Sequence, residues 1–186
     1  EIGGGERLTE SKAASLLGLS RTPLRIALTI LEREGVLEKL DGRGYRVRSI
    51  NLQTVEHATE LRAMLEGLAA GRIAANGPSQ AVIRAVESSI AMSEAVVDRP
   101  TITKREISTF QESNRLFHDT IIDECGNDYV RDAYEQVRRI PILRPGAFTK
   151  RPGQKNILRQ RMTVAHSHHA VVWEAIQLGD AIRAEN

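Results

Sequence analysis

The sequence predicts a mainly α-helical protein, in which a small winged helix-turn-helix is followed by an all-α antiparallel helical bundle. Two observations support this fold class. Two helical segments and a short hairpin follow one another within residues 9–48, and apolar residues then recur at helical spacing without strand-like alternation. Because the strand pattern stops near Ser49-Ile50-Asn51, we divide the chain into two domains, residues 1–50 and residues 51–186.

A short helix and a longer one, joined by a tight turn, are predicted at the start of the chain. Thr9 can cap the first helix and Gly18 can end it. The second helix is expected over residues 20–34, with Ser20 or Thr22 as its cap. The residues expected to face the core are Ala13, Leu16 and Leu17 in the first helix and Leu24, Ala27, Leu28 and Leu31 in the second.

A basic hairpin follows the second helix. Residues 36–40 and 45–48 read as strands, and Asp41-Gly42 between them is a strong signal for a hairpin turn. Residues 1–50 carry nine Lys and Arg against seven Asp and Glu, whereas the rest of the chain is balanced at seventeen each. A helix-turn-helix with a basic wing predicts contact with DNA phosphates and bases.

The segment SRTPLRIAL, followed by LEREGVLEKLDGRGYRV, closely resembles the winged helix-turn-helix of the GntR family of bacterial transcription regulators. The family usually reads S-R-x-P-V-R-E-A-L there, so Ile26 replaces an acidic residue. The resemblance also implies one more helix at the start of the domain. Residues 1–8 look like the loop after that helix, so we expect the sequence to lack it.

The helix over residues 20–34 is expected to lie in the major groove of double-stranded operator DNA. Arg21 and Arg25 share one face and are the candidates for base edges or adjacent phosphates, because arginine pairs bidentately with guanine. Thr9 and Thr22 can donate to phosphates at the helix starts.

The predicted wing supplies the remaining candidates for DNA contact. Arg43 is expected at its tip, where Gly42 and Gly44 allow the backbone to approach the minor groove or the phosphates. Arg46 and Arg48 either contribute to this surface or form a solvated strand face.

Composition places the chain among ordinary globular proteins, with 41% hydrophobic and 27% charged residues. It contains neither a run of about 18 apolar residues nor a secretion signal, so we expect a cytoplasmic protein without membrane contact. The single Cys125 cannot form an internal disulfide and is expected to be a small buried side chain.

Helical spacing and strong breakers divide the second domain into a series of helices. Leu61, Leu65, Leu68 and Ala69 mark the apolar face of the first of them. The expected ranges are 52–76, 79–97, 103–124 and 154–178, with a Pro- and Gly-rich interval before the last of these and a sixth helix beginning near the end of the chain. After the break at Gly126-Asn127, a further helix is expected to carry Tyr129, Ala133, Tyr134 and Val137.

The second domain is similar to the helical effector domain, called FCD, of the FadR-type branch of the GntR family. The matching segments are ELRAMLE at 60–66, NRLFH at 114–118, Gly126-Asn127, and HHAVVWEAI with Gly179-Asp180. Many members of this branch bind a divalent metal between these helices. The resemblance implies Asn114, His118 and His169 as ligands, with a further histidine on a last helix that we expect to be truncated here.

Asn114 and His118 are four residues apart and therefore project from one helix face. Imidazole ligands suit zinc or nickel, and the neutral amide of Asn114 should bind a metal less tightly than a carboxylate would. The alternatives are a metal-free polar pocket or core histidines. His166, three residues before His169, either lines the effector pocket or is solvated.

Arg62 is a candidate for effector binding, because a guanidinium group can pair with a carboxylate ligand. The alternative is a local ion pair with Glu66, four residues further along the helix. Asp119, Asp123 and Glu124 lie near His118, but the sequence supplies neither a paired nucleophile nor a phosphate-binding loop, so we do not expect an enzyme.

The sequence therefore predicts a ligand-responsive transcription regulator, and the resemblance implies a repressor released by a small carboxylate effector. One helix-turn-helix reads one half-site, so we expect a homodimer on a pseudo-palindromic operator. A metal-free sensor of an acyl ligand, with the same DNA-binding role, is the main alternative. A metal-dependent enzyme is the other.

Overall fold

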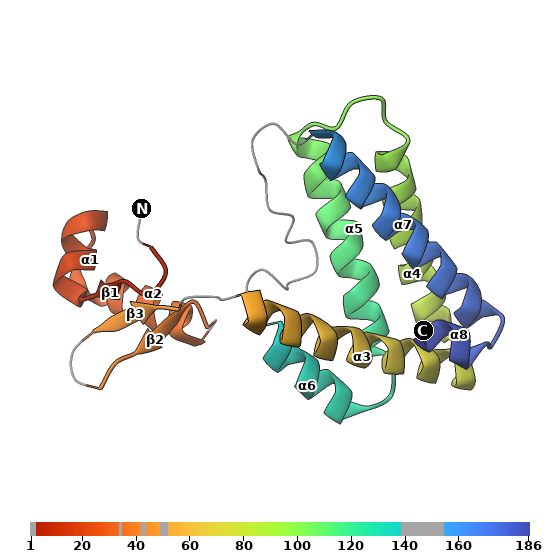
Figure 1. Cartoon of the computed structure of the whole chain (residues 1–186), viewed down its shortest axis with the longest axis horizontal. Coiled ribbons are helices and arrows are strands. Elements are labelled where there is room, and N and C mark those ends of the chain that lie inside the picture. The colour runs from red at the N-terminus through yellow and green to blue at the C-terminus, as the bar shows by residue number, and fades with distance from the viewer. Residues whose placement is uncertain (1–2, 34, 42–43, 49–51, 139–154) are drawn as a thin grey trace.

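The computed structural model describes residues 3–33, 35–41, 44–48, 52–138 and 155–186, and it confirms the predicted fold class (Figure 1). Helices and one small sheet form a winged helix-turn-helix, and helices alone form the rest of the described chain. The predicted domain boundary at residues 49–51 lies outside the described residues.

In the winged part, two helices pack beside a three-stranded antiparallel sheet. The elements are β1 (Arg7–Leu8), α1 (Glu10–Leu17), α2 (Arg21–Arg33), β2 (Leu37–Lys39) and β3 (Tyr45–Val47), with the strand order β1-β3-β2. The core consists of Leu8, Ala13, Leu24, Leu28, Leu37 and Tyr45. The apolar stripe of α2 therefore faces the core as predicted, with Ala27 and Leu31 at its partly buried edge.

Local interactions explain where α1 begins and why the wing contains Gly44. The Thr9 hydroxyl accepts a hydrogen bond from the Lys12 backbone N–H at 3.2 Å, which confirms Thr9 as the cap of α1. Gly44 has a φ of 115°, and a Cβ at this position would lie 3.0 Å from the Leu8 carbonyl oxygen. Only glycine fits both conditions.

Two predictions for the winged part are wrong. Residues 1–8 were expected to form a loop, but Arg7 and Leu8 pair with Arg46 and Tyr45 as strand β1. A two-residue strand is too short to show alternation in the sequence. Leu16 and Leu17 were expected to face inward, yet 55% and 59% of their surfaces are exposed. The reason is that α1 packs mainly against α2 and buries only the face that carries Ala13. The predicted turn residue Gly42 lies outside the described residues.

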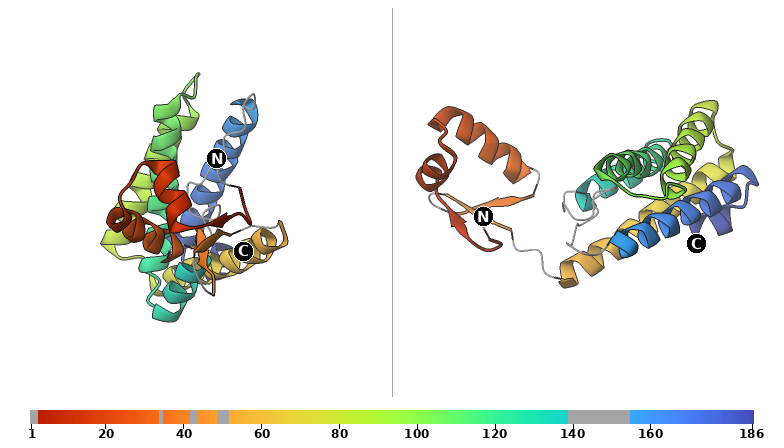
Figure 2. Two further views of the ribbon diagram at one scale, coloured as in Figure 1. Left: turned by 90° about the vertical axis from the view of Figure 1, so that its left-hand side faces the viewer. Right: turned by 90° about the horizontal axis from the view of Figure 1, so that it is seen from above.

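The helical part contains α3 (Leu52–Asn76), α4 (Gln80–Val97), α5 (Lys104–Asp123), α6 (Asp128–Val137), α7 (Lys155–Gln177) and α8 (Ala181–Glu185). In Figure 1, α4, α5 and α7 run side by side, and α3, with α6 along it, lies across their lower ends. Figure 2 shows the short α8 folded back beside α7 and the end of α3. No helix in the described ranges is both long enough and apolar enough to cross a membrane.

The predicted starts of α4 and α5 are confirmed by their caps. Ser79 caps α4 by accepting a hydrogen bond from the Val82 N–H, and Thr103 forms a capping box with Glu106 at the start of α5. Cys125 is buried, as expected. The predicted Pro- and Gly-rich interval at residues 141–153 lies outside the described residues.

The apolar face of α3 matches the prediction only in part. Ala69 is buried and Leu65 is partly buried, as predicted, but Leu61 and Leu68 are 47% and 39% exposed. Ala70, Ile73 and Ala74 complete the core face. Small residues face the core because neighbouring helices approach α3 closely. At Gly67 a Cβ would lie only 2.4 Å from the Glu185 carbonyl oxygen, so the backbone of α8 lies directly on α3.

Candidate functional site

A cavity of about 500 Å³ lies between α3, α5, α7 and α8. It brings together Arg62, Asn114, His118 and His169, the candidates predicted on three separate helices. The other residues that line it are Ala63, Glu66, Gly67, Ala70, Phe117, Ile121, Ala165, His168, Val172, Ala184, Glu185 and Asn186. His166 is not among the lining residues.

The two predicted histidine ligands face each other. The Nε2 atoms of His118 and His169 are 3.3 Å apart. The ring of Phe117 stacks on His169, with the ring centres 4.0 Å apart and the planes inclined by 10°, which fixes the orientation of His169. Asn114 precedes His118 by one turn of α5 and is 7% exposed. The arrangement presents two imidazole nitrogens and one amide to the cavity.

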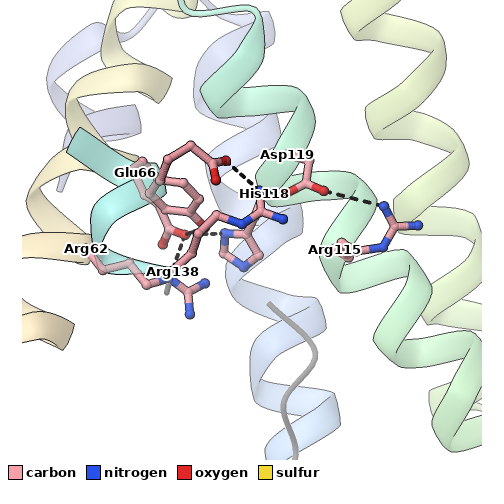
Figure 3. A network of polar contacts seen from close by, with 8 residues as sticks. Arg62, Glu66, Arg115, His118, Asp119 and Arg138 are labelled. Atoms are coloured by element: carbon pink, nitrogen blue, oxygen red, sulfur yellow. Dashed lines mark hydrogen bonds and ion pairs between the residues drawn. The ribbon is translucent and has the colours of Figure 1, made fainter. Parts of the chain in front are cut away.

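Behind His118, the carboxylate of Glu66 joins three side chains (Figure 3). Its Oε1 atom lies 2.9 Å from Nδ1 of His118 and 2.8 Å from Nε of Arg62. The hydroxyl of Tyr134 donates to the same oxygen at 2.8 Å. Glu66 therefore connects the cavity to α6.

These contacts set the charges of the site. Burial alone would raise the pKa of the Glu66 carboxyl, but His118 and Arg62 outweigh it and lower that pKa to about 2. Burial, assisted by His118, lowers the pKa of His169 to about 3. The pKa of Tyr134 is raised by burial and by Glu66. At neutral pH, Glu66 is ionised and His169 is neutral.

The His118–His169 geometry fits a divalent metal. A tetrahedral ion that binds two imidazole nitrogens at about 2.0–2.1 Å holds them about 3.3–3.4 Å apart. The measured separation of the two Nε2 atoms is 3.3 Å. Among the described residues, no group of three or more His, Cys, Asp or Glu side chains is placed to hold a metal ion. A third ligand would therefore be the Asn114 amide oxygen, water or a bound anion.

Arg62 forms the local ion pair with Glu66 and also lines the cavity. Its role in effector binding stays a prediction. The remaining effector candidate, His166, lies instead between α4 and α7, where its Nδ1 atom is 2.9 Å from the Ser93 hydroxyl. Its predicted role gains no support from the cavity and stays a prediction. His168, which was not predicted as a site residue, lines the cavity.

A second set of ion pairs extends from the site on the outer side of α5 (Figure 3). Asp119, the neighbour of His118, lies 3.4 Å from Arg115 and 3.2 Å from Arg138, which follows α6. Arg138 also pairs with Glu135 at 3.0 Å. Adjacent residues of α5 therefore serve different surfaces, because His118 faces the cavity and Asp119 faces α6.

Sequence reasoning missed Glu66 and Tyr134 as parts of the site. Glu66 was identified only as the possible ion-pair partner of Arg62. Its contact with His118 spans 52 positions along the chain and depends on the packing of α3 against α5. No local pattern indicates such a contact, although a carboxylate near a histidine ligand is a common arrangement.

The candidate DNA-contacting residues lie on the exposed surface of the winged part. Arg21, Thr22 and Arg25 are exposed along α2. Nε of Arg25 pairs with Glu10 of α1 at 2.9 Å, which links the two helices of the motif. Arg43 lies outside the described residues.

In the wing, Gly44 packs against the backbone of β1, which explains its conformation without reference to DNA. Arg46 of β3 pairs with Glu38 of β2 at 3.1 Å, an ordinary cross-strand ion pair. Arg48 is exposed.

Comparison with known proteins identifies both parts of the chain. Residues 1–47 match the family model described as bacterial regulatory proteins, gntR family, and residues 57–186 match the FCD domain. The HTH-type transcriptional regulator YdhC of Bacillus subtilis is 26% identical over 133 residues, which cover 72% of this chain and 57% of that protein. A probable D-xylose utilization operon transcriptional repressor of Paenarthrobacter nicotinovorans is 40% identical over 72 residues, which cover 39% of this chain and 31% of that protein.

Among solved structures, McbR/YncC of E. coli aligns with a TM-score of 0.66 over 99% of this chain and 82% of that chain. At 18% identity this similarity establishes a common fold. The chain spans less than two thirds of the length of the two curated relatives described above. From the two family matches, in this order along the sequence, the chain belongs to the GntR family of DNA-binding transcription regulators, with an FCD domain after its helix-turn-helix.

Proposed function

We propose that the protein represses transcription from a two-fold operator and is released when a small organic acid, together with a divalent metal, occupies the cavity between α3, α5, α7 and α8. The observation that carries this proposal is the meeting of Arg62, His118 and His169 at one cavity. A guanidinium group and two imidazole nitrogens are the groups that would recognise a metal-bound carboxylate.

Different residues of the chain would bind the metal and the effector. His118 and His169 would hold the metal through their Nε2 atoms, and the Asn114 amide would complete the protein ligands. The metal would supply open positions for carboxylate oxygens of the effector. Arg62 is oriented by Glu66 and would neutralise a second carboxylate or the remaining negative charge.

In the winged part, α2 would enter the major groove with Arg21 and Arg25 toward base edges or phosphates. Because each chain carries one helix-turn-helix, a pseudo-palindromic operator requires two copies. A repressing role agrees with the Paenarthrobacter relative, which is described as a probable operon repressor.

Regulation would follow from linkage. A ligand releases DNA only if it binds the free dimer more tightly than the operator-bound dimer, and operator DNA must then weaken ligand binding by the same factor. The hydrogen bond from the Tyr134 hydroxyl to Glu66 links the cavity lining to α6, and we propose it as a route by which ligand binding is passed on to that helix.

The test combines metal analysis with DNA binding. The metal content of the purified protein is measured first, and operator binding is then titrated with small hydroxy- and dicarboxylic acids, with and without a strong chelator. The proposal expects bound metal and an acid that weakens operator binding only when metal is present. Absence of metal even after reconstitution would contradict the metal part of the proposal and leave the DNA-binding role intact.

A metal-free sensor of an acyl ligand is the second candidate. The observation in its favour is the apolar share of the cavity lining, which includes Ala63, Ala70, Ile121 and Val172. For this candidate the acids would have no effect, and an acyl ligand would weaken operator binding to the same extent in the presence of the chelator.

A further inference from the structure

We propose that Glu66 is a positioning residue for the metal site, because it accepts a hydrogen bond from the Nδ1–H of His118 and thereby directs the Nε2 lone pair of His118 toward the cavity. This inference rests on the proposed function of the cavity. It adds a residue of α3 to a site whose expected ligands come from α5 and α7.

The first step is the hydrogen-bond chemistry of the contact. An ionised carboxylate can only accept hydrogen bonds, and a neutral imidazole carries one N–H. Since Oε1 of Glu66 lies 2.9 Å from Nδ1 of His118, Nδ1 must carry the proton. The opposite nitrogen, Nε2, then has the free lone pair, and it is the nitrogen that lies 3.3 Å from Nε2 of His169.

The second step concerns what lies between the two Nε2 atoms. With the lone pair of His118 directed at His169, the contact requires the proton of His169 to reside on its own Nε2. The Nδ1 atom of His169 is buried and has no hydrogen-bond partner, which agrees with an acceptor that nothing satisfies. A divalent metal would take the place of that shared proton and bind both lone pairs.

The third step is the rigidity of Glu66. Its Oε1 atom also accepts hydrogen bonds from Arg62 and Tyr134, both at 2.8 Å. Tyr134 is 1% exposed, so its hydroxyl cannot move away without disturbing the core. Glu66 is therefore held in place before any ligand arrives, and its orientation of His118 does not depend on the metal.

The fourth step separates Glu66 from the ligands. The oxygen that contacts His118 already has three donors, and His118 stands between this oxygen and His169. Glu66 would act through His118 by fixing its tautomer and increasing the basicity of Nε2. Carboxylates that act on metal-binding histidines in this way typically change metal affinity by about tenfold to a hundredfold.

The experiment has two readouts. In the unsubstituted, metal-free protein, nitrogen-15 NMR of the histidine side chains at about pH 8, above the ordinary histidine pKa, reports the tautomer of His118. Zinc affinity is then measured by competition with a chromophoric chelator for the unsubstituted protein, for Glu66→Gln, and for Glu60→Gln. Glu60 is an exposed residue of the same helix and serves as the matched control.

We expect the Nδ1–H tautomer at His118, a loss of zinc affinity of about tenfold or more in Glu66→Gln, and unchanged affinity in Glu60→Gln. An Nε2–H tautomer in the unsubstituted protein, or equal zinc affinity in the two variants, would overturn the inference. If the unsubstituted protein binds no zinc, the metal function fails, and the tautomer alone decides whether Glu66 orients His118. Melting temperatures of both variants separate a positioning effect from a loss of folding.

Discussion

The Nε2 atom of His118 on α5 lies 3.3 Å from the Nε2 atom of His169 on α7, although 51 positions separate the two residues in sequence. Phe117 stacks on one ring and Glu66 contacts the other, so both rings are fixed by side chains outside the pair. Two nitrogens at this separation match the spacing of two ligands of a tetrahedral metal ion.

We therefore predict that His118→Ala and His169→Ala each remove the metal. The purified protein should contain about one ion per chain, and each variant almost none, because a single imidazole with an amide makes a weak site. Elemental analysis checks this result. His57→Ala, which removes an exposed histidine of α3, is the control and should retain the metal. Retention of metal by both site variants would mean that the ion binds elsewhere.

Asn114→Asp should tighten metal binding, since a carboxylate compensates the charge of the ion better than an amide does. We expect the affinity for zinc to rise about tenfold, which corresponds to about 1.4 kcal/mol of binding free energy. In the metal-free protein the same substitution should lower stability, because Asn114 is 7% exposed and a buried carboxylate is costly. Zinc titration and thermal melting measure the two effects. Asn76→Asp, at an exposed end of α3, should change neither.

Acidification should destabilise the metal-free protein. The pKa of His169 is lowered from 6.5 to about 3. Below pH 6.5, His169 therefore binds a proton in the unfolded chain but not in the native protein. Within this window the contribution of His169 falls by up to about 1.4 kcal/mol per pH unit. Glu66, whose pKa is lowered from 4.5 to about 2, adds a loss of the same sign at lower pH. Urea unfolding at several pH values, with His169→Gln, measures the slope.

Between neutral pH and pH 4.5, where glutamate begins to titrate, the free energy of unfolding of His169→Gln should depend less steeply on pH. His57→Gln should keep the slope of the unsubstituted protein. A slope that persists unchanged in His169→Gln would show that another group carries it.

Arg21→Ala and Arg25→Ala should each weaken operator binding by about 1–3 kcal/mol if they read base edges. Arg25 already pairs with Glu10, so Glu10→Gln should preserve or strengthen binding by releasing the guanidinium group. Fluorescence anisotropy with labelled operator DNA measures these changes. Arg84→Ala on α4 removes an exposed arginine outside the winged part and should have no effect. Equal losses in all three arginine variants would indicate non-specific electrostatics.

Local signals predicted most of the fold. Thr9, Ser79 and Thr103 each precede a helix and cap it, so the helix starts could be read from the sequence. Exposure was harder to predict for Leu16 and Leu61, because the sequence gives helical spacing but not which neighbouring helix covers which side. Strand β1 was missed because its pairing with β3 is entirely non-local.

The residues of the candidate site also differ in how far the sequence predicted them. Asn114 and His118 share a helix face by spacing alone, and His169 was added through the family resemblance. Glu66 completes the site through packing of α3 against α5, which neither spacing nor motif specifies. Residues that act through a partner on another helix are invisible to periodicity, even when they lie within a recognised segment.

The direct contact of α8 with Gly67 constrains how ligand selectivity can be altered. Ala184 and Glu185 form one wall of the cavity, and main chain rather than side chains sets its distance from α3. Shortening side chains therefore gains no space on that side, and any residue larger than glycine at position 67 displaces the wall. If the cavity binds an acid as proposed, variants meant to accept a bulkier one should change Val172 of α7, where a side chain occupies the space.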